Sequence, residues 1–277
     1  MKVSALILTY NEERNIAACL ESLDGIEDIV VVDSGSTDRT CEIAARFGAR
    51  VLSRPFDDFA NQRNFGLDEG GFREDWVLHL DADEVATPAF LAALAALQPT
   101  DGIDGYRVPS KTMLRGQWLQ RSGMYPTYQV RLGRRDALRF VQVGHGQRED
   151  LPPERVGTFP EPYLHYNFSH GLTQWLRKHV AYAQAEAAQL FTDRQIPLEP
   201  RDIFDGDATR RRRALKRLVN RLPVVVRPPL RFVHAWIVRR GFLDGPAGLQ
   251  YAVMLACYEA MIAAQVLDLK AAAGARN

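Results

Sequence analysis

The first eighty residues of the chain alternate short apolar runs with segments that carry the spacing of helices. The apolar runs predict buried strands and comprise residues 3–8, 29–32, 51–52 and 76–80. The intervening segments predict helices and comprise residues 16–23, 39–47 and 59–67. Because strands that alternate with helices form α/β domains, the pattern predicts a mainly parallel sheet flanked by helices.

Polar clusters follow three of the predicted strands at their carboxyl ends. They are Thr9, Tyr10, Asn11 and Glu12 after the first strand, Asp33, Ser34, Gly35 and Ser36 after the second, and Asp81 and Asp83 after the fourth. Ligands of parallel α/β sheets bind beyond the carboxyl ends of the strands. We therefore expect the three clusters to meet at one rim of the sheet and to form one binding site.

Asp81 and Asp83 are the residues of this rim that most specifically suggest chemistry. Residues two apart in an extended segment point to the same side, so both carboxylates face one pocket. Two adjacent carboxylates repel each other unless a positive charge lies between them. A divalent cation, Mg²⁺ or Mn²⁺, that also holds substrate phosphate would supply that charge. The alternative is a polar strand end or a helix N-cap, where aspartate is also common.

Two common nucleotide-binding motifs are missing from the sequence. No Gly-x-Gly-x-x-Gly follows the first predicted strand, which disfavours an NAD or FAD enzyme, and there is no Gly-Lys-Ser/Thr phosphate loop. The charge is nearly balanced, with 35 basic and 34 acidic residues, which argues against a nucleic-acid partner. The sequence therefore disfavours both a dinucleotide-binding site and a phosphate-loop site at this rim.

The three clusters, taken in their order, resemble the family 2 inverting glycosyltransferases. The resemblance rests on Thr9 to Glu12, on Val32 to Asp38 and on Asp81 to Asp83, and it covers roughly the first half of the chain. It implies a GT-A fold, the fold of nucleotide-diphospho-sugar transferases. It also implies that the first two clusters hold the nucleotide of a sugar donor. The second aspartate, Asp83, would bind the metal that bridges the donor diphosphate.

Individual residues of the rim have further expected roles and alternatives. Asp33 would accept hydrogen bonds from the base or the ribose, and Asp81 would hold the donor or support the metal as a ligand or from behind it. Arg63 would touch phosphate or sugar. The alternatives are a turn-starting residue for Asp33, the start of a helix for Glu12, and a solvated helix face for Arg63 and its neighbour Asn64.

A transferase of this kind also needs a general base that removes the proton from the acceptor hydroxyl. The resemblance implies an acid in a short stretch such as His-Glu or Glu-Asp late in the catalytic domain. The matching stretch here is residues 143–150, in which Gly146 rather than an acid follows His145. Glu149, Asp150 and His145 are the candidates, and Glu149 is favoured. The alternative is a surface turn before two prolines.

The middle of the chain, residues 105–139, alternates aromatic, basic and polar residues. This pattern predicts hairpin strands and a loop at the border of an acceptor site. Residues 129–132 have the composition of a strand, which would place Arg131 near the active site. Aromatic rings and arginines suit sugar stacking and phosphate binding, and they suit an ordinary sheet surface equally well.

The last third of the chain has a different character from the first. We predict a catalytic domain over residues 1–170 and a helical region over residues 171–277. Within residues 201–240 there are twelve Lys or Arg and three Asp. Basic and aromatic residues in an apolar helical stretch suit an anionic membrane surface. The candidates for membrane contact are Arg211, Arg212, Arg213, Phe232 and Trp236.

The apolar stretch over residues 245–264 is barely long enough to span a membrane, and Glu259 would make spanning costly. We therefore expect a peripheral or monotopic protein rather than one with a spanning helix. The alternative is a soluble helical subdomain that packs Leu249, Val253, Tyr258 and Ile262 against the core.

Phe242-Leu243-Asp244-Gly245, after a basic and proline-containing apolar segment, resembles bacterial lipopolysaccharide core glucosyltransferases. This implies a hexose transferred from a nucleotide-diphosphate sugar, expected to be a UDP-sugar, to a lipid-linked or lipopolysaccharide acceptor at the cytoplasmic face of the inner membrane. Two other functions remain open at this point. They are a nucleotidyltransferase acting on a sugar phosphate and a non-catalytic membrane-binding adaptor.

Overall fold

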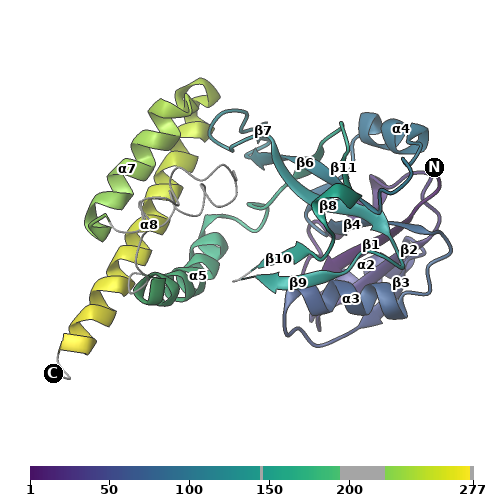
Figure 1. The fold of residues 1–277 in the computed structure, drawn as a ribbon, viewed down its shortest axis with the longest axis horizontal. Coiled ribbons are helices and arrows are strands. Elements are labelled where there is room, and N and C mark those ends of the chain that lie inside the picture. Colours follow the sequence, from purple (N-terminus) through teal and green to yellow (C-terminus); the bar gives the residue numbers. More distant parts are fainter. Residues whose placement is uncertain (144–145, 194–221, 275–277) are drawn as a thin grey trace. The chain divides into compact units, whose positions relative to one another are not determined.

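The computed structural model describes residues 1–143, 146–193 and 222–274 (Figure 1). The chain divides into two compact units, which are described separately below. The first comprises residues 1–120 and 124–170, and the second comprises residues 121–123 and the described residues from 171 onward. Arg211, Arg212 and Arg213, and the basic segment expected around them, lie outside the described residues.

Four parallel strands form one half of the sheet in the first unit, in the order β3-β2-β1-β4. They are β1 (Ser4–Thr9), β2 (Ile29–Asp33), β3 (Arg50–Ser53) and β4 (Trp76–Asp81). β1 and β2 pair in parallel, and so do β1 and β4 and β2 and β3. The strands expected from the apolar runs are therefore confirmed, and so is their parallel arrangement.

The other half of the sheet is mixed, in the order β8-β6-β12-β5 beyond β4. Its strands are β5 (Glu84–Val85), β6 (Gly105–Leu114), β7 (Gln117–Trp118), β8 (Thr127–Arg134), β11 (Val156–Thr158) and β12 (Tyr163–His165). β8 runs antiparallel to both β4 and β6, whereas β11 and β12 run parallel to β6. A separate hairpin consists of β9 (Phe140–Val143) and β10 (Gly146–Glu149).

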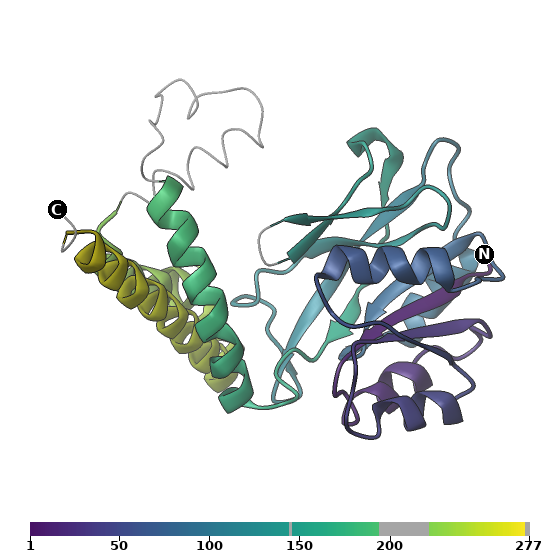
Figure 2. The same cartoon turned by 90° about the horizontal axis from the view of Figure 1, so that it is seen from below.

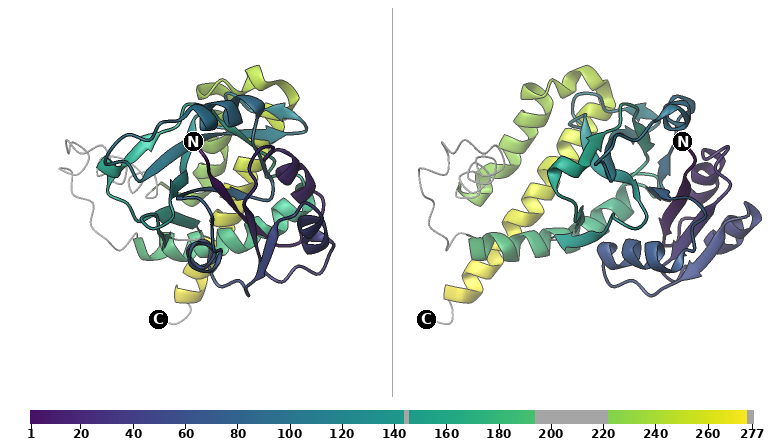
Figure 3. Two further views of the ribbon diagram at one scale, coloured as in Figure 1. Left: turned by 90° about the vertical axis from the view of Figure 1, so that its right-hand side faces the viewer. Right: turned by 45° about the vertical axis from the view of Figure 1, so that its right-hand side comes forward.

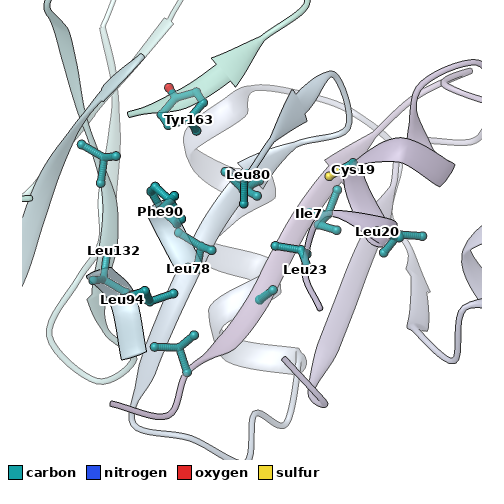
Figure 4. Packing of buried hydrophobic residues seen from close by; sticks show 14 of the residues in the cluster. Ile7, Cys19, Leu20, Leu23, Leu78, Leu80, Phe90, Leu94, Leu132 and Tyr163 are labelled. Atoms are coloured by element: carbon teal, nitrogen blue, oxygen red, sulfur yellow. The ribbon is translucent and has the colours of Figure 1, made fainter. Parts of the chain in front are cut away.

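Helices cover both faces of this sheet because successive side chains of a strand point to opposite faces. In β1, Ala5 and Ile7 pack into one core and Leu6 and Leu8 into the other. The first core is completed by α1 (Ile16–Glu21), α2 (Thr40–Arg46) and α4 (Pro88–Ala96), and part of it is drawn in Figure 4. The second is completed by α3 (Phe59–Glu69), seen along the opposite face in Figure 2.

The second unit is helical. Its elements are α5 (Leu172–Asp193), the short turns η3 (Val224–Val226) and η5 (Gly241–Asp244), α7 (Arg227–Val233), the π-helical turn η4 (His234–Val238) and α8 (Gly245–Gly274). α5 and α7 both pack against α8, as Figures 1 and 3 show. The core between α5 and α8 contains Ala183, Ala187 and Leu190 on one side and Ile262 and Val266 on the other.

Two details of α8 differ from the pattern expected from the sequence. The helix continues ten residues beyond residue 264, where the apolar stretch noted in the sequence ends. Of the residues that the soluble-subdomain alternative would pack against the core, Ile262 is buried, but Leu249 and Val253 are 42% and 45% exposed, so that alternative is wrong for these two residues. Within the described residues, one stretch, Gly241–Ala273, is long and apolar enough to cross a membrane by length and composition alone. Buried core helices pass the same test.

Candidate active site

The three polar clusters lie together at the carboxyl ends of β2, β1 and β4. In the sheet register, Thr9 of β1 is opposite Asp33 of β2, and Leu8 is opposite Asp81 of β4. The amide of Ser34 donates to the carbonyl of Thr9 (3.0 Å), and the amide of Ala82 donates to the carbonyl of Leu8 (3.2 Å). Neighbouring strands thus keep their pairing just past their ends, which brings the clusters to one rim.

The first two clusters are locked together by hydrogen bonds. The amide of Asn11 donates to Ser36 Oγ (2.8 Å), and Asn11 Oδ1 accepts from the amide of Thr37 (2.8 Å). Asn11 has a φ of +53°, a left-handed conformation that asparagine tolerates better than most residues. The amide of Glu12 donates to Thr40 Oγ1 (2.8 Å). The two loops therefore form one rigid wall, from which the ring of Tyr10 stands 58% exposed.

Asp33 occupies the turn position that was considered as its alternative role. Its Oδ2 accepts from the amides of Gly35 (2.9 Å) and Ser36 (2.8 Å), and Gly35 takes a φ of +91°. The Asp33 side chain is buried, and Ser36 Oγ donates to its other oxygen. Asp33 therefore shapes the loop through its own backbone. Its predicted contact with a nucleotide remains a prediction.

Asp81 is held by two buried arginines. Arg63 Nη2 lies 2.7 Å from its Oδ1, and Arg131 Nη2 lies 2.8 Å from its Oδ2. Burial alone would raise the pKa of Asp81, but Arg131 and Arg63 hold it well below its usual range. Both oxygens are thus engaged, which supports the role of Asp81 behind the metal rather than as a direct ligand. Arg131 lies at the site, as expected from its predicted strand.

Arg63 differs from its sequence interpretation as a residue that touches donor phosphate. Only 1% of its surface is exposed, and its guanidinium is directed at Asp81. The solvated-face alternative is wrong for Arg63, and its contact with the donor stays a prediction. The side-chain amide of Gln147 contacts Arg63 as well. Its oxygen accepts a hydrogen bond from Arg63 Nε, and its nitrogen donates to the carbonyl of Phe59 (2.8 Å). Asn64 pairs with the backbone of Phe140 in both directions, so it joins α3 to β9.

Glu84 is a buried member of this charge cluster that the sequence interpretation missed. Its Oε1 accepts from Arg131 Nη2 (2.5 Å), and its Oε2 accepts from the amide of Asp81 (2.9 Å). Glu84 and Asp81 bring two negative charges, and Arg63 and Arg131 bring two positive charges. This balance leaves Asp83 as the acid of the Asp-x-Asp pair that the arginines do not neutralise.

Asp83 faces His165, the second residue of the site that the sequence did not indicate. Asp83 Oδ2 lies 3.5 Å from His165 Nε2, and the amide of Tyr166 donates to the Asp83 carbonyl (2.8 Å). Burial would lower the pKa of His165, but the carboxylates of Asp83, Glu84 and Asp81 raise it to about 9. The side chains of Asp83 and His165 are 21% and 24% exposed, so both reach solvent.

A third missed residue, His170, contacts the first cluster. Its Nε2 lies 2.9 Å from Glu12 Oε2, and Asn15 Nδ2 donates to the Oγ of Ser169 (2.8 Å). Burial raises the pKa of Glu12, with the nearby charge of Asp83 adding to the effect, while Asn15 and His170 oppose it. The chain from His165 to His170 therefore runs from Asp83 to Glu12 along the rim.

The residues considered for the general base lie on or beside β10. Glu149 pairs with Phe140 across the hairpin, and the amide of Asp150 donates to the carbonyl of Arg139 (2.7 Å). Within residues 1–143 and 146–170, the ion-pair partners of Asp81 and Asp83 are Arg63, Arg131 and His165, and neither Glu149 nor Asp150 belongs to this group. His145 lies outside the described residues. The assignment of the base therefore stays a prediction.

Among the described residues, no group of three or more His, Cys, Asp or Glu side chains is already arranged around a common point as a complete metal cage. Asp83 and His165 would supply two ligands of an open site. An open site is what a cation shared with a phosphate ligand requires, because Mg²⁺ keeps most of its shell for water and phosphate oxygens.

The sequence of this unit matches the model of glycosyl transferase family 2 over residues 4–147. The chain belongs to this family. The match covers β1 to β4 and all three polar clusters, and the mixed sheet with helices on both faces is a GT-A-like fold. The expected fold class and the expected enzyme class, a glycosyltransferase, are both confirmed.

Two relatives illustrate the family membership. The lipopolysaccharide core biosynthesis glycosyltransferase LpsC of Rhizobium meliloti is 32% identical over 167 residues, which are 58% of this chain and 58% of LpsC. The "uncharacterized glycosyltransferase RT0209" of Rickettsia typhi is 35% identical over 128 residues, 45% of this chain and 42% of that protein. The chain thus spans about half the length of the curated relatives it matches.

Solved structures with a related arrangement include the glucosyl-3-phosphoglycerate synthase of Mycobacterium tuberculosis in complex with Mn²⁺, UDP-glucose and phosphoglyceric acid. It is 18% identical, with a TM-score of 0.47, over 68% of this chain and 78% of that chain. The same synthase in complex with Mg²⁺ and UDP gives a TM-score of 0.44 at 20% identity.

Proposed function

We propose that this family 2 glycosyltransferase is a metal-dependent inverting enzyme that moves a hexose from a nucleotide-diphosphate sugar to a lipid-linked or lipopolysaccharide acceptor. The observation that carries the proposal is the balance of charge at the rim. Asp81 and Glu84 are neutralised by Arg63 and Arg131, whereas Asp83 has no arginine partner among the described residues, lies beside His165 and reaches solvent. A solvent-facing carboxylate beside a nucleotide-binding wall suits a cation that arrives with a diphosphate.

The residues present fit such a cation. Adjacent ligands of an octahedral shell with bonds of about 2.1 Å lie about 3 Å apart. Asp83 Oδ2 and His165 Nε2 are 3.5 Å apart, so small side-chain movements would let both bind one Mg²⁺ or Mn²⁺ once His165 gives up the proton that the neighbouring carboxylates stabilise. Carboxylate and imidazole are both ligands of Mn²⁺, and Asp81, fixed by its arginines, would orient the site from behind. When bound, the cation offsets the charge of the departing diphosphate.

The chain's own residues would bind the donor and prepare the acceptor. The loops of Asn11 and Asp33 form the wall for the nucleotide, with the ring of Tyr10 exposed beside them. A base removes the proton of the acceptor hydroxyl. At the same time, the hydroxyl oxygen forms a bond to the sugar carbon, and the bond from that carbon to the diphosphate breaks. Attack opposite the leaving group inverts the configuration. Glu149 remains the favoured base, with Asp150 and His145 as the other candidates.

The acceptor class and the location rest on the relatives and on the helical unit. LpsC is named for lipopolysaccharide core biosynthesis, and the helical unit exposes many large apolar side chains. We place the protein at the cytoplasmic face of the inner membrane, with a catalytic domain over residues 1–170 and a membrane-associated region after it. The donor in this proposal is a UDP-sugar.

Calorimetric titration with UDP, GDP and dTDP, each with and without Mn²⁺, tests the proposal. We expect tight binding of UDP that depends on Mn²⁺. Asp83→Asn removes the charge that the cation needs, so it should weaken Mn²⁺-dependent UDP binding at least tenfold. Asp136→Asn is a matched control, because the Asp136 side chain is exposed and pairs only locally with Arg135.

Metal-independent binding of the same strength by wild-type protein would refute the role of the cation. Unchanged binding by Asp83→Asn would remove Asp83 from the metal site. Preference for GDP or dTDP over UDP would leave the transferase proposal in place and correct only the donor.

A further inference from the structure

The end of η4 and the η5 turn before α8 carry four exposed large apolar side chains within seven residues. Ile237, Val238, Phe242 and Leu243 are 57%, 65%, 49% and 59% exposed. We call these four residues the apolar tip. Large apolar groups rarely gather on a protein surface without a partner.

Close backbone contacts hold the tip in one conformation. A Cβ on Gly241 would lie 2.5 Å from the carbonyl oxygen of Ala235, and a Cβ on Gly248 would lie 2.1 Å from the carbonyl oxygen of Gly241. Arg240 takes a left-handed φ of +57° to make the turn. The backbone thus approaches itself at two glycines, and this packing leaves the tip side chains on the outside.

Asp244 fixes the inner side of the same turn. Its buried carboxylate accepts from the amide of Ser122 (2.8 Å), from Ser122 Oγ (2.7 Å) and from the amide of Arg121 (3.0 Å). The polar group of the turn is therefore satisfied inside the unit, while the apolar groups face outward. This is the reverse of the usual arrangement of a surface turn, in which polar side chains face the solvent.

The segment that leads into the tip carries charges of one sign, and the acid that follows it, Asp244, is buried. Residues 222–243 contain four arginines and no aspartate or glutamate. Arg227 is buried against Glu259 (2.9 Å), whereas Arg239 and Arg240 flank the tip directly. Apolar side chains flanked by arginines suit the boundary between acyl chains and anionic headgroups, where the arginine stems lie along apolar surface and the guanidinium groups meet phosphate.

The packing of α8 argues for a shallow contact rather than a spanning helix. Its second half buries Ile262, Ala263 and Val266 against α5. Glu259 forms an ion pair with Arg227. A spanning α8 would therefore have to take this ion pair, and α5 packed against it, into the bilayer. Shallow insertion of the Ile237–Leu243 turn would take neither this ion pair nor α5 into the bilayer.

We propose that the apolar tip inserts into the interface of an anionic phospholipid bilayer and is the membrane contact of this protein. The inference deepens the proposed membrane-associated function and rests on it. It also corrects the residues expected from the sequence. Phe232 and Trp236 are half-buried, with their rings stacked on each other at 6.5 Å, so they support the tip from within the unit.

Flotation of the full chain with vesicles tests the proposal, using phosphatidylcholine alone and phosphatidylcholine with phosphatidylglycerol at 7:3. Ile237→Ser/Val238→Ser should lower the partition coefficient on the mixed vesicles at least tenfold. Leu267→Ser/Leu269→Ser is the matched control, since these side chains of α8 are also exposed, at 47% and 37%, but lie outside the tip. The control should bind within twofold of wild type.

Two further variants separate the contributions of charge and insertion. Arg239→Gln/Arg240→Gln should bind both kinds of vesicle equally weakly, because it keeps the apolar side chains and loses the preference for anionic lipid. A fluorophore on Val238→Cys, in a Cys41→Ser/Cys257→Ser background, should shift to the blue on mixed vesicles. The same label on Leu267→Cys should not shift.

Wild-type binding by Ile237→Ser/Val238→Ser would overturn the proposal and leave the segment around residues 211–213 as the anchor. A change from dimer to monomer in this variant, measured by light scattering without vesicles, would instead make the tip an interface between copies of the chain. The flotation contains no donor or acceptor. Failure of UDP binding would therefore count against the proposed transferase alone.

Discussion

At the scale of single residues, the site depends on how buried charges are paired. Arg131 contacts both Asp81 and Glu84, so one guanidinium holds two carboxylates. Removing one partner of a buried pair costs about 3–5 kcal/mol, because the other charge is left uncompensated. The arginines thus hold the carboxylates on either side of Asp83, and the Asp83 carboxylate itself has no arginine partner among the described residues.

His79 lies directly behind this cluster and gives a prediction for the pH dependence of stability. It is fully buried in β4, and neither ring nitrogen has a hydrogen-bond partner among the described residues. Burial, followed by the charges of Arg63 and Arg131, holds its pKa well below 6.5. The folded state therefore keeps His79 neutral, whereas the unfolded state takes up a proton below pH 6.5.

Because the unfolded state binds more protons, His79 lowers the free energy of unfolding as the pH falls below 6.5. The slope approaches about 1.4 kcal/mol per pH unit for one histidine. His79→Leu should remove this slope and also remove two unpaired polar atoms. Urea unfolding of both proteins between pH 5 and pH 8 measures the difference. Parallel curves over this range would show that His79 is protonated, or solvated, in the folded state.

The residues that the sequence did not indicate share one property. His165 reaches the site because β12 pairs with β5, which brings it opposite Glu84 across about eighty residues of chain, and His170 follows five residues later. Glu84 lies three residues from Asp81, but its ion pair with Arg131 is made by the tertiary fold. Asp33, Asp81 and Asp83 could be predicted, since each directly follows an apolar strand. No local spacing signals a contact made by two short strands. Arg63 was misjudged for a similar reason, because its partner Asp81 is fixed by the tertiary fold.

At the scale of elements, the first half of the sheet could be predicted and the second half only in part. The buried strands β1, β2 and β4 are continuous apolar runs, which is the pattern of a parallel sheet covered on both faces. β6 mixes apolar residues with Arg107, Ser110 and Lys111, and β12 has only three residues. The place of β6 depends on its pairing with β8, and the place of β12 depends on its pairing with β6 and β5, which the sequence pattern does not determine.

The start of α8 gives a prediction about an element that depends on one glycine. In Gly248→Ala, the new Cβ would meet the backbone oxygen of Gly241, so the helix or the η5 turn must shift. Overpacking typically costs about 1–3 kcal/mol. We expect a lower thermal midpoint for the helical unit and weaker vesicle binding through the displaced tip. Ala260→Ser, an exposed position on the same helix, should change neither quantity.

At the scale of the whole molecule, two compact units carry two different kinds of surface. The first unit presents acids and backbone amides at the rim of a sheet, and the second presents apolar side chains and arginines on helices. The chain passes between the units at residues 121–123 as well as near residue 171. The two proposed activities therefore depend on different residues, although these residues belong to one chain.

This separation predicts that each activity can be removed without the other. Ile237→Ser/Val238→Ser should leave the dissociation constant for UDP with Mn²⁺ within twofold of wild type, because neither residue belongs to the rim. Asp83→Asn should float with anionic vesicles as wild type does. Transfer to a lipid-linked acceptor in those vesicles needs both units, so each variant should lose at least tenfold in that assay. A tip variant that keeps full transfer to the membrane-bound acceptor would show that the acceptor reaches the rim without lipid contact by the helical unit.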